Sequence, residues 1–141
     1  MNDATIDPLY SLGVPEMDRE HAHCIDLVEA FRVAAAGHLA DSAGLAAARR
    51  TLEELLDYTQ THFADEERLL ASYQYPALAE HKARHRELTA AMLKLIRELA
   101  EHRDATTPLR LNLFVTVWLL EHIMTDDWKY ASFIIAQREK P

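Results

Sequence analysis

The chain has 141 residues, of which 49% are hydrophobic and 27% charged, a composition typical of one globular domain rather than of a disordered or membrane protein. Its 15 Lys and Arg against 23 Asp and Glu give a net charge of -8, which disfavours nucleic acid or an anionic membrane as the main partner. The single cysteine, Cys24, excludes an internal disulfide, and the first residues lack a secretion signal. We therefore expect a cytoplasmic protein with no membrane insertion.

Glycine and proline are rare and divide the chain into long helix-forming stretches. The 3 glycines and 5 prolines leave four segments rich in Ala, Leu, Glu and Arg, with apolar residues at spacings of three and four. Pro76 and Pro108 are each expected in the first turn of a helix, the latter with Thr107 as N-cap. The sequence predicts an N-terminal arm at 1–16 and helices at about 17–36, 45–72, 76–102 and 108–137. Because the connections are short, the expected fold is all-α, an antiparallel up-down-up-down four-helix bundle with 1–141 as one domain.

Each predicted helix carries histidine or carboxylate side chains that can face the same place. On the second helix His62 and Glu66 are four residues apart and share a face, as do His81 and His85 on the third. The other two helices offer His21 and the group His122, Asp126 and Asp127. Counted from the turns, these residues fall at similar heights, with mismatches mostly under about 7 Å that side chains can span. The sequence therefore predicts a buried metal site.

The remaining histidines are expected away from this site. His38 and His102 fall beside turns at the opposite end of the bundle. His23 lies about 200° around the helix from His21 and should face outward. Glu20 with His23 has the Glu-x-x-His spacing of ferritin-like di-iron enzymes, but the outward histidine does not suit that role.

The number and type of donors favour two metal ions. Five histidines and two carboxylates exceed the six positions of one ion, and the lack of cysteine ligands argues against structural zinc or an iron–sulfur cluster. Lys82 stands where a zinc-protease helix needs glutamate. Two six-coordinate irons need about twelve positions, of which the imidazoles, two bridging carboxylates and a bridging oxide or hydroxide fill about eleven. About one position then remains for a small ligand such as dioxygen.

Four segments, DREH, HFADEE, HKARH and WLLEHIMTDD, resemble the motifs of the hemerythrins, in particular the single-domain bacterial hemerythrins. The resemblance extends from about Leu9 to Ile135. It implies a non-haem di-iron site, bridged by oxide or hydroxide, that binds dioxygen reversibly at the iron with fewer histidines. The implied ligands are His21 and His62 for one iron, His81, His85 and His122 for the other, and Glu66 and Asp127 as bridges.

The choice between Asp126 and Asp127 does not follow from ideal helix geometry. Asp127 is five residues from His122, about 140° away, whereas Asp126, at four, lies nearer the same face. The hemerythrin spacing H-x-x-x-x-D favours Asp127, and a local bulge or loosened turn would bring it toward the site. We therefore hypothesise that Asp127 is the bridging carboxylate.

Reversible binding needs a dry, narrow apolar pocket that denies protons and reaction partners to the bound oxygen. The candidates for its wall lie close to the expected ligands in sequence: Cys24, Ile25, Phe63, Trp118, Leu119 and Leu120. The alternative is that these residues are simply bundle core. Acceptors for the imidazole N–H groups are also expected, but the sequence does not name them.

Three classes of function are consistent with such a site. The first is an oxygen-binding protein, not an enzyme, for oxygen storage, transport or delivery to an oxidase. The second is an oxygen or redox sensor acting through a signalling partner, since 141 residues leave no room for an output domain. The third is a di-iron peroxidase or nitric-oxide-handling enzyme, which needs substrate access and a proton route. A monomer is expected.

Overall fold

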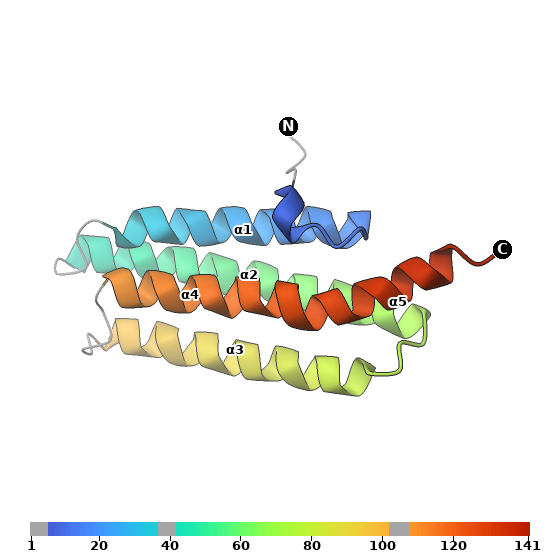
Figure 1. Ribbon diagram of the computed structural model, residues 1–141. Helices are drawn as coiled ribbons and strands as arrows, with labels where there is room; N and C mark the ends of the chain where they lie inside the picture. The colour runs from blue at the N-terminus through green and yellow to red at the C-terminus, as the bar shows by residue number, and fades with distance from the viewer. Residues whose placement is uncertain (1–5, 37–41, 102–107) are drawn as a thin grey trace.

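Four helical rods run antiparallel in the computed structural model of the protein, which describes residues 6–36, 42–101 and 108–141 (Figure 1). The rods are α1 (Pro15–Ala35), α2 (Ser42–Ser72), α3 (Leu78–Ala100), and a fourth made of α4 (Pro108–His122), a π-helical segment (Ile123–Asp127) and α5 (Trp128–Arg138). The described residues contain no strand, and none of their helices is both long and apolar enough to cross a membrane. The all-α up-down-up-down bundle expected from the sequence is confirmed.

The helices begin close to the residues that the sequence indicated. Pro15 stands in the first turn of α1, two residues before the expected start. α3 begins at Leu78 rather than at Pro76, because α2 first closes with a Schellman turn. In that turn Gln74 has a φ of 54°, and Tyr75 N donates a hydrogen bond to Leu70 O at 3.0 Å. Pro108 begins α4, whereas Thr107 lies outside the described residues.

The end of the N-terminal arm lies against the bundle beside α1 (Figure 1). A short 3-10 helix at Pro8–Tyr10 precedes Leu12 and Val14, which are both buried. The backbone N–H of Leu12 donates to Asp18 Oδ1 at 2.8 Å, so the first turn of α1 holds the arm. The arm therefore covers one end of the core.

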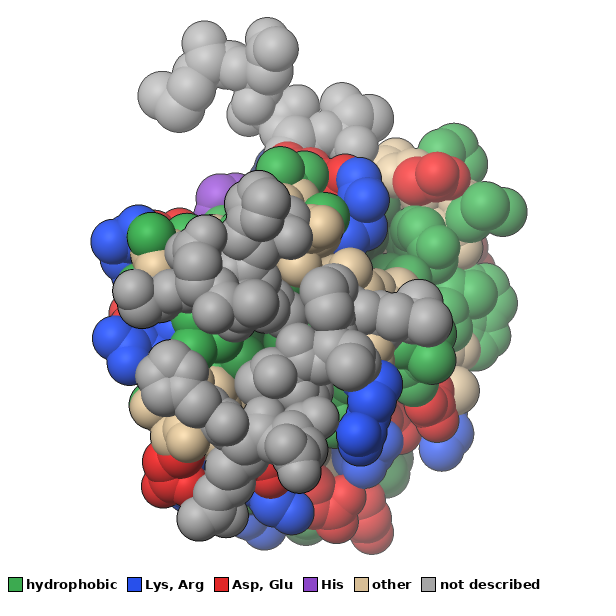
Figure 2. Space-filling view, turned by 90° about the vertical axis from the view of Figure 1, so that its left-hand side faces the viewer, with side chains coloured by type: hydrophobic (Ala, Val, Ile, Leu, Met, Phe, Trp, Pro, Cys, Tyr) green, Lys and Arg blue, Asp and Glu red, His purple; other side chains and the backbone are tan. Residues whose placement is uncertain are grey.

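The rods do not pack equally closely. α1 packs against α2 and α4, and α2 packs against α3, whereas α3 and α4 lie farther apart than these pairs. Seen along the bundle, much of the described surface carries mixed charges, while hydrophobic side chains gather on the right-hand flank (Figure 2). The exposed apolar flank and the opening between α3 and α4 are features that the sequence did not indicate.

Candidate metal centre

The seven side chains expected to bind metal lie together in the half of the bundle next to the α2–α3 turn. Every rod contributes at least one of them, and all are buried, with at most 5% of any residue exposed. They are His21, His62, Glu66, His81, His85, His122 and Asp127. Their donor atoms form two groups, and within each group one atom per residue lies within 4.8 Å of all the others. Donors about 2.1 Å from one ion, on opposite sides of it, would be about 4.2 Å apart, close to this limit.

Two carboxylates belong to both groups. Glu66 Oε2 lies 3.4 Å from His21 Nε2 and 3.2 Å from His62 Nε2. The other oxygen, Oε1, lies 2.6 Å from His81 Nε2 and 3.0 Å from His85 Nε2. Each oxygen of Glu66 therefore faces a different set of histidines.

Asp127 repeats this arrangement. Its Oδ2 lies 3.1 Å from His21 Nε2, whereas its Oδ1 lies 3.2 Å from His81 Nε2 and 3.1 Å from His122 Nε2. One group thus contains two histidines and the other three, and both carboxylates stand between them. This is the donor pattern of two cations that share two bridging carboxylates.

The unsatisfied donors and acceptors also point to cations. Several buried atoms of the cluster have no hydrogen-bond partner. They include both side-chain oxygens of Asp127 and the Nε2 atoms of His21, His62, His85 and His122. Buried polar atoms left unpaired are costly, so a cluster of them calls for a further ligand. Neutral imidazole nitrogens and carboxylate oxygens are donors that suit iron and similar transition metals. The residues present therefore fit the di-iron group that the sequence implied.

The π segment decides which aspartate enters the site. In it the hydrogen bonds run from residue i to i+5, so a residue five positions after His122 returns to the face of that histidine. Asp127 is accordingly fully buried among the imidazoles. Asp126 points elsewhere, and its Oδ2 accepts a hydrogen bond from His122 Nδ1 at 2.9 Å and another from Arg84 Nε at 3.1 Å.

Carboxylates also fix the orientation of two other imidazoles. Nδ1 of His62 donates to Glu20 Oε1 at 2.8 Å, and Nδ1 of His85 donates to Glu67 Oε2 at 2.8 Å. With the Nδ1 proton held by the carboxylate, Nε2 is directed into the cluster, where its lone pair would be available to a cation, and the carboxylate raises the basicity of the ring. Neither acceptor was assigned from the sequence. Their only sequence signal is that they stand beside His21 and Glu66 in the chain.

Tyr130 is a further residue of the site that sequence reasoning missed. Its side chain is fully buried, and its hydroxyl donates a hydrogen bond to Glu66 Oε2 at 2.9 Å. Burial, then the nearby negative charges of Glu66 and Asp127, raises the pKa of the phenol well above its ordinary value. Tyr130 therefore stays protonated and keeps Glu66 in place.

The electrostatic balance is between two buried carboxylates and several imidazoles. Burial favours the neutral form of Glu66, but the positive charge of His62 and the hydrogen bond from His81 Nε2 hold its pKa well below the usual range. The same conflict lowers the pKa of Asp127, against burial and the charge of Glu66. Burial opposes the charge on the imidazoles, but the carboxylates beside each ring outweigh it; for His62 these are Glu66 and Glu20. The pKa is raised to about 9 for each of His21, His62, His81 and His122.

The predicted wall residues are placed differently from one another. The ring of Phe63 stacks on His85 at 3.7 Å between centroids and meets the edge of His122 at 5.7 Å. Cys24 is fully buried, and burial raises the pKa of its thiol, with a further contribution from the nearby acidic groups. Leu119 is buried in the core, whereas Ile25 and Leu120 are half-buried.

Trp118, one of the predicted wall residues, lines a surface groove between α3 and α4. A second groove of about 410 Å³, between α2 and α3, is lined by Phe63, Glu67 and His85 and reaches the edge of the site. His23 is exposed, with its ring against Tyr58, as expected for an outward residue. The predicted turn residues His38 and His102 lie outside the described residues.

The fold and the cluster define a class of protein, a four-helix bundle built around two adjoining groups of histidines that share two carboxylates. Residues 12–134 match the family model of the hemerythrin HHE cation binding domain. The chain therefore belongs to the hemerythrin family.

Individual relatives agree with this assignment. The chain is 30% identical over 126 residues to a bacteriohemerythrin of Stenotrophomonas maltophilia, which covers 89% of this chain and 78% of that protein. It is 32% identical over 124 residues to a myohemerythrin of Riftia pachyptila, covering 88% of each. A bacteriohemerythrin of Clostridium acetobutylicum is 28% identical over 130 residues, with 86% of this chain and 93% of that protein covered.

Proposed function

We propose that this chain binds dioxygen reversibly at a di-iron centre and serves in oxygen storage, transport or delivery rather than as an enzyme. The observation that carries the proposal is the sharing of Glu66 and Asp127, each of which presents one oxygen to each of the two histidine groups. The family match, whose description is a cation binding domain, supports it independently.

The residues would divide between two ions as the two groups do. His21 and His62 would bind one iron, and His81, His85 and His122 the other, with Glu66 and Asp127 as bridges. Two iron ions with a bridging oxide or hydroxide supply the electrons and the open position that reversible dioxygen binding requires. Because the first group has one histidine fewer, it leaves more room for a small molecule. Since the donors come from every rod, we further infer that residues 1–141 act as one domain.

The surrounding side chains would protect the centre from water. Phe63 covers the imidazoles of His85 and His122. Cys24 and Leu119 are both buried, and along the chain they stand close to His21 and His122 respectively. Apolar walls exclude proton donors and reaction partners, which favours release of the ligand unchanged.

The test is an absorption spectrum of iron-quantified protein, reduced without air, exposed to oxygen and then swept free of it. We expect two irons per chain and a visible charge-transfer band that appears with oxygen and disappears on its removal. Irreversible oxidation would instead favour an oxygen or redox sensor acting through a partner. Steady turnover of peroxide or nitric oxide would favour a di-iron enzyme.

Two histidine variants make this test specific to the site. His62→Ala removes a donor of the smaller group and should lower the iron content and abolish the reversible band. His23→Ala makes the same change at an exposed position on α1 and should leave both unchanged. Equal behaviour of the two variants would contradict the assignment.

A further inference from the structure

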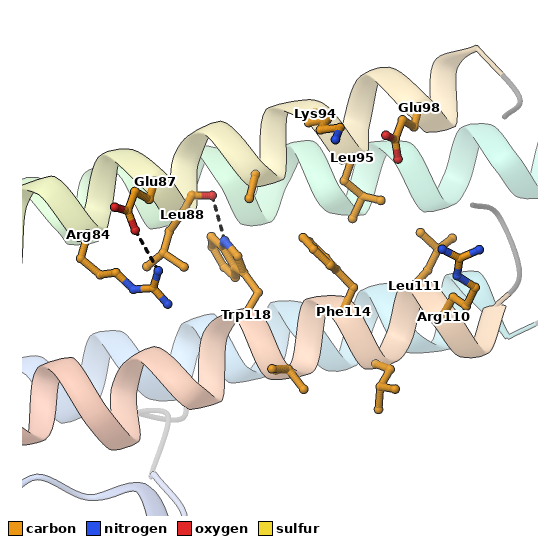
Figure 3. A pocket seen from close by; sticks show the side chains of 13 residues that line it. Arg84, Glu87, Leu88, Lys94, Leu95, Glu98, Arg110, Leu111, Phe114 and Trp118 are labelled. Atoms are coloured by element: carbon orange, nitrogen blue, oxygen red, sulfur yellow. Dashed lines mark hydrogen bonds and ion pairs between the residues drawn. The ribbon is translucent and has the colours of Figure 1, made fainter. Parts of the chain in front are cut away.

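A groove of about 830 Å³ runs along the surface between α3 and α4 (Figure 3). Leu88, Leu95, Leu111 and Trp118 are buried residues in its apolar wall. At one end Trp118 Nε1 donates a hydrogen bond to the carbonyl oxygen of Leu88 at 2.8 Å, which joins the two helices. The groove lies outside the candidate metal centre and has no role in the function proposed above.

A ridge of exposed hydrophobic side chains borders this groove on the α4 side. Leu113, Phe114 and Val117 line the groove and are 62%, 41% and 47% exposed. Figure 2 shows hydrophobic side chains gathered on the flank that faces the viewer in Figure 1, where α4 passes in front of α2. Contiguous exposed apolar surface of this kind marks an interaction site, whereas apolar residues scattered singly over a surface are ordinary.

The charges around the groove fit a protein surface better than a small charged ligand. The rim carries both signs, Arg84, Lys94 and Arg110 against Glu87 and Glu98. A ligand of one charge would meet repulsion from part of this rim, whereas the rims of protein interfaces are mixed and polar. The occupant should therefore carry an apolar ridge and charges of both signs.

The α4 ridge itself has these properties. Arg110 precedes it and Glu121 follows it, and within the described part of the chain neither makes an ion pair. Eleven residues are close to three helical turns, so both charges lie on the face of the ridge, about 16 Å apart. The face is thus positive at one end, apolar in the middle and negative at the other end.

We propose that this face binds a second copy of the chain, with the two α4 helices antiparallel about a two-fold axis. In a two-fold interface every contact occurs twice, so Arg110 of each copy would face Glu121 of the other. The same register sets Phe114 opposite Val117, and each ridge covers the groove of the other copy. A parallel arrangement would instead oppose like charges. The resulting homodimer differs from the monomer expected from the sequence.

The test is sedimentation of the full-length, metal-loaded protein over a range reaching about 100 µM, above the micromolar Kd of a modest interface. The wild-type chain should form a dimer. Arg110→Glu should raise the dimer Kd about tenfold or more, because two like-charge contacts replace two favourable ones. Arg110→Glu combined with Glu121→Arg restores opposite charges across the axis and should restore the dimer.

Two further variants test the apolar part of the interface. Phe114→Asp should abolish the dimer, whereas Val33→Asp, at a residue 63% exposed on α1, should leave it intact. Circular dichroism checks that each variant is folded. A wild-type protein that stays monomeric at every concentration would overturn the proposal, as would a dimer that is insensitive to Phe114→Asp and Arg110→Glu. A monomer that binds a hydrophobic fluorescent probe at Phe114 would also overturn it and assign the groove to an apolar ligand. None of these outcomes depends on oxygen binding.

Discussion

The hydrogen bond from His85 to Glu67 gives the sharpest test of how the site is held. Glu67 lies outside the cluster, yet its Oε2 accepts the Nδ1 proton of His85 at 2.8 Å, and its side chain is only 27% exposed. Glu67→Gln keeps the size of the side chain and an acceptor oxygen but removes the charge. The change therefore probes the charge of the acceptor without altering any donor of the cluster.

The expected loss of iron affinity follows from the kind of hydrogen bond that is weakened. Replacing a charge-assisted hydrogen bond by a neutral one costs about 1 to 1.5 kcal/mol, which is about tenfold in affinity. Glu67→Ala also frees the ring of His85 to turn, so the loss should approach about 100-fold. We expect both variants to keep their fold. Glu67→Gln should bind iron more weakly than the wild-type chain, and Glu67→Ala more weakly still. Iron affinity is measured anaerobically by competition with a ferrous chelator.

Asp65→Asn is the matched control. Asp65 is on the same helix, its side chain is 31% exposed, and it pairs with Arg68 rather than with a histidine. This variant changes the net charge by the same amount and should retain the wild-type iron affinity. If Glu67→Gln binds iron as tightly as Asp65→Asn does, the carboxylate does not orient His85 and the reasoning fails.

Three further predictions concern stability, each measured by urea unfolding. Tyr130→Phe removes the hydroxyl that donates to Glu66 and should cost about 1.5 to 3 kcal/mol, because the acceptor is charged and buried; a loss below about 0.5 kcal/mol would contradict this role. Arg138 donates two hydrogen bonds to Glu16 and lowers the pKa of that carboxyl below its ordinary 4.5. The pair therefore stabilises the fold above pH 4.5, and this contribution is lost as the pH falls. Glu16→Gln should cost less than about 1 kcal/mol at neutral pH, since the pair is exposed, and a smaller amount at pH 3; an equal cost at both values would exclude the ion pair. Gly13→Ala should cost more than about 1 kcal/mol, because Gly13 has a φ of 79° and a Cβ there would lie 3.1 Å from Ile135 Cδ1; wild-type stability would refute the strain.

The sequence by itself determined the bundle and the set of residues that meet in it. Helix periodicity places His62 with Glu66, and His81 with His85, on common faces without any knowledge of the partners. A rise of 1.5 Å per residue then fixes the height of each donor relative to the turns. These quantities are properties of one helix, which is why they can be read from the chain alone.

Asp127 marks the limit of that reasoning. Ideal helix geometry favoured Asp126, and only the resemblance to hemerythrins favoured its neighbour. The π segment resolves the conflict by returning the fifth residue to the face of His122. The nearness of Asp126 to His122 was nevertheless real, because that carboxylate accepts the Nδ1 proton of the ring.

Tertiary structure alone decided the contacts made between rods. Glu20 meets His62 and Tyr130 meets Glu66 across 42 and 64 residues of chain, and no local spacing predicts such pairs. The groove between α3 and α4, and the exposed apolar residues of α4 beside it, also depend on how whole faces pack. Local geometry fixes which way a side chain points from its own helix, whereas its partner depends on where the other helices lie.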